Sequence, residues 1–550
     1  MKNTHKIFYL ALFVLALAVN FAGINNKFFT DDPGLYASIA KNLVYKKDFF
    51  QLFTYNRDWL DKPHFPFWAI LLSFKVFGIS VWAYRLPALL FFVISLVYTF
   101  LFTRKYYGWE TGAIAVLLLM TAQNTILANT DVRAEPYLMG LIIGSIYHIA
   151  QLEERFTFSD MLLAALLTAF AIMTKGIFVT TAIYGSLLGH LLFQKKLKHL
   201  LQFKWLWLLV LTFIFTLPEF YALYIQFDLH PEKTVFGMHH VSGVKWFLWD
   251  SQFGRFVNNG PITRKTTGSV FFYLHTLLWA FAPWCLLFYY AVFKNIKAII
   301  RQKKQAEYYA LSGGLLLLLL FSISRFQLPF YTNAVFPLFA IVTAPICFNQ
   351  LSKFGAKCRL MGQWIFVILL PVAVILVNYF LKPVNELFFI ADIILFGVIV
   401  AFVSIKIKES HKRVFFLNCA AALFAGFYVN TVFYNEIVPY RGQIAAAKFV
   451  NQEVFDHSPL YVVNAENNIF QFYCKRPVDI MPIAGFDSLK PNPTAIFYIN
   501  QQSMDYLIKT HANFKIIRSF LDYPQENLLP DFINKETRFK TLGQVYLVTK

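Results

Sequence analysis

The sequence predicts a polytopic α-helical membrane protein of about thirteen transmembrane helices, followed by a C-terminal α/β soluble domain on the outer side. Three observations carry this prediction. Of 550 residues, 58% are hydrophobic and only 15% are charged, whereas soluble proteins carry about a quarter charged. Apolar runs close to the roughly 20 residues that cross a bilayer recur along most of the chain. Beyond about residue 438, the apolar runs shorten to strand length.

The expected transmembrane helices follow one another from residue 7 to residue 434. Their approximate spans are 7–24, 82–103, 111–128, 136–152, 161–174, 177–193, 205–225, 270–293, 308–323, 328–348, 361–381, 387–405 and 414–434. Lysine and arginine gather in short loops that the alternation of spans places on one side, around 104–105, 195–204, 294–304, 353–359 and 406–413. Because basic loops stay on the cytoplasmic side, we expect a cytoplasmic N-terminus and a C-terminal domain outside.

Two units are expected, 1–437 in the membrane and 438–550 outside it. Long outer loops cover about 25–81 and 226–269. In the first loop, Asp32 is a good N-cap and Pro33 suits the first helical position of an amphipathic helix, which can lie along the membrane surface. A second helix is expected near 65–74. In the outer domain we expect a helix at 444–450 and strands at 460–463, 495–499, 514–517 and 545–548.

Charge and cysteine content exclude two other classes of protein. The net charge of +20 is spread between apolar runs, whereas a nucleic-acid-binding protein gathers its basic residues on one face. The five cysteines show neither a disulfide framework nor a metal-ligand spacing. The expected partner is therefore the membrane, and nucleic acid is not expected.

Polar residues at the predicted outer face form clusters that topology does not require. They are Asp31-Asp32, Asp61-Lys62-Pro63-His64, Asp131 with Arg133 and Glu135, Lys175, the segment 239–255, and Arg325 with Tyr331. Carboxylates can take a proton from an acceptor hydroxyl, and cations can stabilise a departing phosphate. Such a set suits a reaction on an anionic lipid headgroup.

The motifs in these clusters resemble one branch of the C-type glycosyltransferases, the lipid A aminoarabinose transferases and protein O-mannosyltransferases. They are Asp32 with Tyr36, Asp61-Lys62-Pro63, Arg133-x-Glu135-Pro136, Lys175-Gly176, Gly254-Arg255, and Ser324-Arg325 with Leu328-Pro329 and Tyr331. They occur in order along the whole membrane region. The resemblance implies a membrane enzyme, acting as a monomer, that moves a sugar from a polyprenyl-phosphate donor to a lipid A-like or exported protein acceptor, with inversion. The high content of phenylalanine, lysine and asparagine suggests a bacterial source, and we therefore expect the protein in the inner membrane.

The resemblance also implies roles for individual residues. Asp32 matches the catalytic base, with Asp31 in reserve, and Glu135 belongs to the acceptor or catalytic cavity. The donor phosphate is expected at Lys62, Arg255, Tyr331, Tyr36, Lys175 and Arg325. Two departures from the family pattern are Pro33, where a second acid is common, and Ser251-Gln252, where some relatives carry Glu-His. Whether the protein binds a divalent metal is therefore left open, and Asp61, His239 and His240 are the side chains that could supply ligands.

Plainer interpretations stand beside these roles. Asp32 could simply cap a helix, Lys62 and Lys175 could be interfacial lysines, and Arg255 could bind lipid headgroups. Tyr331 could belong to the interfacial aromatic belt. For the whole chain, the alternatives are a transporter or flippase of lipid-linked sugars, which would place ionisable groups near mid-membrane, and a receptor that binds its ligand through the outer domain.

Overall fold

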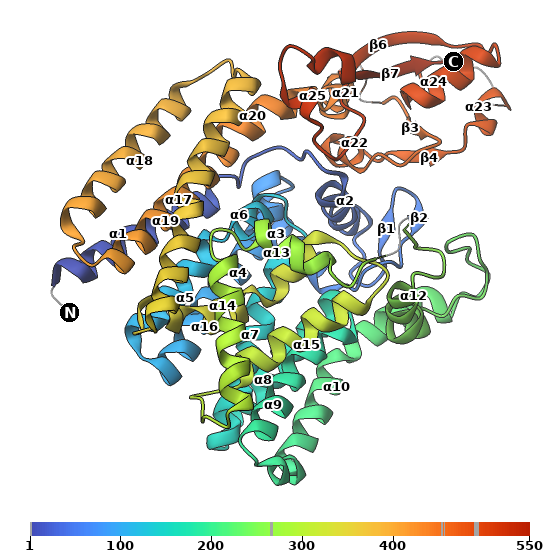
Figure 1. The fold of residues 1–550 in the computed structure, drawn as a ribbon. Coiled ribbons are helices and arrows are strands. Elements are labelled where there is room, and N and C mark those ends of the chain that lie inside the picture. Colours follow the sequence, from blue (N-terminus) through green and yellow to red (C-terminus); the bar gives the residue numbers. More distant parts are fainter. Residues whose placement is uncertain (1–2, 265–267, 453–454, 456, 489–493) are drawn as a thin grey trace.

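The computed structural model describes all residues except 1–2, 265–267, 453–454, 456 and 489–493. Helices from the N-terminus to residue 440 form one large bundle, and the C-terminal domain lies at one end of it, above α2 (Figure 1). The bundle consists of α1 (Asn3–Phe21), α2 (Asp31–Lys46), α3 (Phe65–Phe77), α4 (Val81–Tyr107), α5 (Trp109–Thr121), α6 (Gln123–Thr130), α7 (Glu135–Glu154), α8 (Phe158–Lys175), η1 (Ile177–Val179), α9 (Thr180–Phe193), η2 (Leu197–Leu201), α10 (Phe203–Leu223), η3 (Tyr224–Asp228), α11 (Gly243–Lys245), η4 (Trp246–Asp250), α12 (Ser251–Val257), α13 (Phe272–Ala280), α14 (Cys285–Ile300), α15 (Tyr309–Ile323), η5 (Pro329–Val335), α16 (Phe336–Phe348), α17 (Lys353–Leu381), α18 (Leu387–Lys406), α19 (Ser410–Tyr428), η6 (Val429–Phe433), α20 (Tyr434–Ile437) and η7 (Val438–Tyr440).

Every predicted span coincides with helical structure, although not every span is one straight helix. Seven described helices are long and apolar enough to cross a bilayer, or eight if α5 and α6 form one span, and four further apolar helices are shorter. The α5–α6 pair bends by 57°, and the span expected at 270–293 is divided between α13 and α14. The count of thirteen spans and the orientation in the membrane stay predictions.

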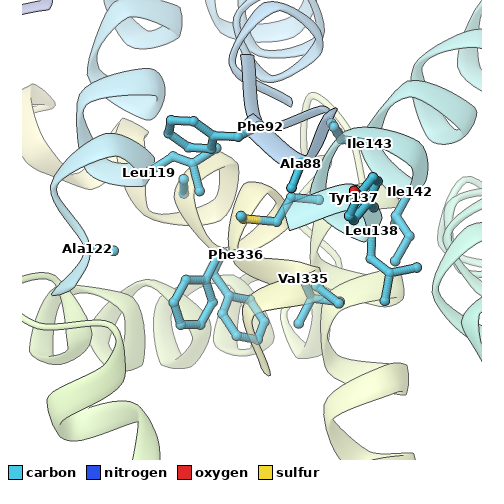
Figure 2. Packing of buried hydrophobic residues seen from close by; sticks show 14 of the residues in the cluster. Ala88, Phe92, Leu119, Ala122, Tyr137, Leu138, Ile142, Ile143, Val335 and Phe336 are labelled. Atoms are coloured by element: carbon cyan, nitrogen blue, oxygen red, sulfur yellow. The ribbon is translucent and has the colours of Figure 1, made fainter. Parts of the chain in front are cut away.

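The bundle interior is packed with apolar side chains from helices that are distant in sequence. Figure 2 shows side chains of α4, α5, α7, η5 and α16 in mutual contact, among them Phe92, Leu119, Tyr137 and Phe336. These four side chains are no more than 1% exposed. Burial of large apolar side chains, each stabilising by roughly 1.5–3 kcal/mol relative to exposure in water, fixes the helix ends that carry the polar clusters.

The C-terminal domain is built on a five-stranded mixed sheet of order β4-β3-β5-β7-β6. Four of its strands and α21 match the elements predicted from the sequence, whereas β4 was not predicted. The described elements of this domain are α21 (Gly442–Val450), β3 (Leu460–Val463), α22 (Asn468–Tyr473), β4 (Asp479–Met481), α23 (Ala484–Ser488), β5 (Ile496–Asn500), α24 (Gln501–Lys509), β6 (Lys515–Asp522), α25 (Pro530–Ile533), η9 (Arg538–Thr541) and β7 (Gly543–Thr549). A short hairpin, β1 (Phe53–Thr54) and β2 (Arg57–Asp58), lies in the first loop.

The first loop is held tightly between the bundle and the C-terminal domain. On α2, Lys41 is only 2% exposed, and its ammonium donates hydrogen bonds to the carbonyl oxygens of Gln471, Phe472 and Cys474 in the C-terminal domain. A buried ammonium is tolerated only when its hydrogen bonds are satisfied. The three carbonyls therefore fix the domain on α2, next to the polar clusters.

Candidate active site

A cavity of about 1040 Å³ lies between the bundle and the C-terminal domain. It collects side chains from the first loop, from the loop between α6 and α7, from the ends of α8 and α12, and from segments 326–333 and 525–528. Its charged lining residues are Asp32, Asp61, Asp131, Glu135 and Glu526, and Lys62, Arg133, Lys175, Arg255 and Arg264. Five acids and five bases therefore meet in one cavity, although several are more than 100 residues apart in sequence.

One side of this cavity, which we call the acidic half, contains Asp32, Asp131, Glu526 and Arg133. The Arg133 guanidinium lies 2.9 Å from an Asp32 oxygen and 3.0 Å from an Asp131 oxygen. Burial alone would lower the pKa of Arg133, but the carboxylates around it, Asp131 foremost, raise that pKa above its ordinary value. Arg133 thus holds the Asp32 and Asp131 carboxylates together on this side of the cavity.

Asp32 is the most accessible carboxylate of this ion-paired cluster. Its side chain is 49% exposed, against 24% for Asp131, and the Asp131 carboxylate also accepts a hydrogen bond from the Thr30 hydroxyl. Asp32 is therefore accessible to a ligand in the cavity, as a general base must be.

The helix-cap expectation for Asp32 is wrong. The helix begins at Asp31, with Thr30 as N-cap residue, so Asp32 lies within the first turn and its side chain is free to turn toward Arg133. Pro33 is still compatible with this turn because the first N–H groups of a helix have no intrahelical acceptor.

Asp31 points away from the cavity, toward the C-terminal domain. Its two carboxylate oxygens accept hydrogen bonds from the backbone N–H and the side-chain amide of Asn468, at 3.1 and 2.6 Å. Burial raises the pKa of Asp31 to about 6. The two adjacent aspartates thus have different surroundings, and Asp31 does not line the cavity.

The opposite side, which we call the cationic half, contains Lys62, Arg255, Arg264 and Asp61. Asp61 forms ion pairs with Lys62, at 2.8 Å, and with Arg255. Arg255 and Arg264 both lie over the Phe326 ring, with guanidinium carbons 5.8 and 5.7 Å from its centroid. Three cations face one carboxylate here, so this half carries an excess positive charge that suits a phosphate.

A third ion pair lies between the two halves. Lys175 pairs with Glu135, and its ammonium lies 3.8 Å from the centroid of the Tyr331 ring. Gly176, which follows Lys175, has φ of +102°, and a Cβ there would lie 2.2 Å from the Gln252 amide nitrogen. Only glycine adopts this backbone conformation readily and fits this space, so it fixes the end of α8 that carries Lys175.

Of the remaining predicted residues, Tyr36 lines the cavity and Arg325 does not. Arg325 is exposed, and its backbone N–H bonds to Phe256 O. His239 and His240 are exposed loop residues outside the cavity, and His239 Nδ1 lies 3.2 Å from the Glu232 carbonyl oxygen.

The residues considered for a metal do not fit one. Asp61 is already neutralised by Lys62 and Arg255, and His239 and His240 lie elsewhere. Throughout the described part of the chain, no three histidine, cysteine or acidic side chains come together as a metal site would need. Zinc sites in proteins use three or four such ligands. The chemistry of this cavity is therefore derived from its own acids and bases.

Several lining residues were not predicted from the sequence. Arg264 follows the segment 239–255, and the accumulation of basic residues in that outer loop was the available signal. Glu526 belongs to the C-terminal domain, and no motif marks it. Asn124 and Asn333 hydrogen-bond to each other at 2.8 Å across the cavity wall, a contact that only the folded bundle creates.

Comparison with known structures identifies the architecture. The crystal structure of ArnT from Cupriavidus metallidurans bound to undecaprenyl phosphate superposes with a TM-score of 0.75 at 17% identity, covering 100% of this chain and 98% of that one. The chain has the fold of ArnT. The apo structure of the same enzyme gives a TM-score of 0.69 at 17% identity, over 99% of this chain and 98% of the other.

Sequence comparisons agree with this ArnT-like fold. Residues 61–221 match the family model of dolichyl-phosphate-mannose-protein mannosyltransferases. An uncharacterized protein of Aquifex aeolicus (strain VF5) is 24% identical over 356 residues, which are 63% of this chain and 65% of that protein's length. The predicted resemblance to the C-type glycosyltransferases is therefore confirmed, by the matched segment and by the fold of the whole chain.

Proposed function

We propose that this protein transfers a sugar from a polyprenyl-phosphate donor to an acceptor at the outer face of the membrane. In this proposal the donor phosphate binds the cationic half of the cavity and the acceptor approaches the acidic half. The ArnT-like fold and the mannosyltransferase-like segment support a transferase of this type. The acceptor is a lipid of the lipid A type or an exported protein.

The observation that carries the proposal is an apolar groove that joins the cavity at its cationic half. The groove has a volume of about 70 Å³ and is walled by apolar side chains such as Phe178, Leu317 and Leu320. It shares four lining residues with the large cavity, namely Lys175, Arg255, Phe326 and Tyr331. Apolar walls that end at cations match a ligand with a hydrocarbon chain and an anionic head. A polyprenyl phosphate has this form.

The proposed reaction is a single displacement at the anomeric carbon. The Asp32 carboxylate takes the proton of an acceptor hydroxyl, whose oxygen forms the new bond to the anomeric carbon. The bond from that carbon to the donor phosphate oxygen breaks, and its electron pair leaves with the polyprenyl phosphate. Attack from the side opposite the leaving group inverts the configuration.

The cations of the site have complementary tasks in this reaction. Lys62 and Arg255 stabilise the charge that develops on the leaving phosphate, as preorganised cations do in other transferases. Lys175 is held by Glu135 at the junction between groove and cavity and binds the same phosphate. Arg133 holds the Asp32 carboxylate in place until an acceptor hydroxyl displaces their contact.

The test is transfer of radiolabel from a pool of polyprenyl-phosphate sugars to membrane acceptors by the purified full-length protein. We expect donor consumption by the parent and its loss in Asp32→Asn. The matched control is Asp58→Asn, because Asp58 lies in the same loop and pairs with Lys233 at 3.0 Å but does not line the cavity. Movement of the intact donor from one leaflet of a vesicle membrane to the other, without transfer of its sugar, would instead support a flippase.

A further inference from the structure

A second cavity lies at the junction of the bundle and the C-terminal domain. Its volume is about 350 Å³, and it shares no lining residue with the large cavity. Three segments form it: the loop after α1, the end of the last bundle helix, and the first turns of α21. The lining residues are Asn25, Asn26, Lys27, Asn435, Val438, Pro439, Arg441, Ile444, Ala445 and Lys448.

The charges that line this junction pocket are all positive. Lys27 and Lys448 both line the pocket, and burial together with the nearby Lys448 ammonium lowers the pKa of Lys27. Neither lysine forms an ion pair with a carboxylate of the described residues. Two ammonium groups held side by side repel each other, and an anion bound between them would remove this repulsion.

Arg441 supplies a third cation, from a buried position. Its side chain is only 4% exposed, and it donates hydrogen bonds to the carbonyl oxygens of Tyr523, at 2.6 Å, and Gln525, at 2.8 Å. Its Nε has no hydrogen-bond partner among the described residues. The Arg441 guanidinium, which also lies 4.0 Å from the centroid of the Phe29 ring, therefore adds positive charge to the wall of the pocket.

The pocket lies where two apolar helices end. Lys27 follows the apolar helix Phe8–Phe21 by six residues, and Asn435 lies near the end of the apolar helix Ser410–Tyr440. In a bilayer, the ends of apolar helices lie at the level of the lipid headgroups, where basic side chains attract anionic lipids.

We propose that the junction pocket binds the phosphate of an anionic lipid headgroup. Lys27, Lys448 and Arg441 supply the positive charge, and the amides of Asn25, Asn26 and Asn435 can donate to phosphate or headgroup hydroxyl oxygens. This site is separate from the transfer reaction and does not depend on the proposed function. A lipid bound there would link the first loop, the last bundle helix and α21, and so stabilise the docking of the C-terminal domain.

Native mass spectrometry of the delipidated full-length protein in detergent tests this site, with phosphatidylglycerol as the anionic probe and phosphatidylcholine as the neutral one. We expect the affinity for phosphatidylglycerol to fall about five-fold in Lys27→Gln or Lys448→Gln and about 30-fold in the double variant. Binding of phosphatidylcholine should not change. Both lysines are exposed, so these variants keep the fold, which an unchanged melting temperature checks.

The matched control is Lys382→Gln, because Lys382 is an exposed lysine at the same junction whose partner is Glu536. It should bind phosphatidylglycerol as the parent does. Displacement by millimolar inorganic phosphate would assign the site to phosphate itself, whereas resistance to displacement would assign it to the intact headgroup. An affinity of the double variant within about two-fold of the parent, or an equal loss in Lys382→Gln, would overturn the proposal.

Discussion

The two halves of the large cavity differ in both charge and supporting structure. In the acidic half, two carboxylates pair with one arginine, and a third carboxylate, Glu526, comes from the C-terminal domain. In the cationic half, three cations accompany one carboxylate, two of them paired with it, and all four residues come from the bundle. The apolar groove is lined by Arg255 of the cationic half and by Lys175 between the halves, and by no residue of the acidic half. This difference indicates that donor binding is a property of the bundle, whereas acceptor binding involves both domains.

Replacing the base of the acidic half should have the largest effect. In Asp32→Asn the rate constant for transfer should fall by about 10²–10⁴-fold, the usual contribution of a general base, with little change in donor binding. Single-turnover transfer of labelled sugar measures this rate. Asp58→Asn should retain the parental rate, and a similar loss in both variants would assign the effect to the fold of the first loop.

On the cationic side, Arg255→Gln should reduce kcat by about 10²-fold, because one stabilising charge on the leaving phosphate is lost, and should raise the KM for the donor. The KM for the acceptor should stay unchanged. Arg57→Gln is the control, because Arg57 is an exposed arginine of the first loop outside the cavity. A rise in acceptor KM without a change in donor KM would contradict the division between the halves.

Glu526 tests whether the C-terminal domain takes part in acceptor binding. Its carboxylate accepts a hydrogen bond from the Asp31 backbone N–H at 2.9 Å and lines the acidic half. In Glu526→Gln the KM for the acceptor should rise by about five-fold, the worth of one hydrogen bond, while donor KM stays constant. Glu536→Gln, in the same domain but paired with Lys382, should leave both KM values unchanged.

Asp31 should affect stability more than catalysis. Its pKa is about 6 in the folded protein, against an ordinary value of 3.8, so the folded state holds this proton more tightly than the unfolded state. The resulting stabilisation, at most about 3 kcal/mol, is complete below pH 3.8 and is lost as the pH rises through 6.

Melting curves between pH 4 and pH 7 measure this contribution. The melting temperature of the parent should decrease over this range, and Asp31→Asn should make the decrease smaller, because asparagine does not ionise. If the melting temperature of Asp31→Asn decreases with pH as steeply as that of the parent, Asp31 does not cause the pH dependence of stability.

Much of the architecture followed from local patterns. Apolar runs predicted the helices because backbone groups in a bilayer must be satisfied internally, and short apolar runs of strand length predicted four strands of the C-terminal domain. The short strand β4 was not predicted, since its three residues, Asp479–Met481, carry too little pattern. Breaks within spans, such as the bend between α5 and α6, depend on packing against neighbouring helices.

The sequence by itself predicted that Asp32, Lys62, Glu135, Lys175 and Arg255 would lie on one face, in outer loops or at the ends of spans, because the predicted topology places them there. Only the tertiary structure decided which of them meet. It paired Asp61 with Arg255, turned Asp31 toward Asn468 and Asp32 toward Arg133, left Arg325 outside the cavity and brought Glu526 into it. The physical reason is that ion pairs and cavity walls depend on distances between segments far apart in the chain, which are set by the packing of the bundle and by the docking of the C-terminal domain.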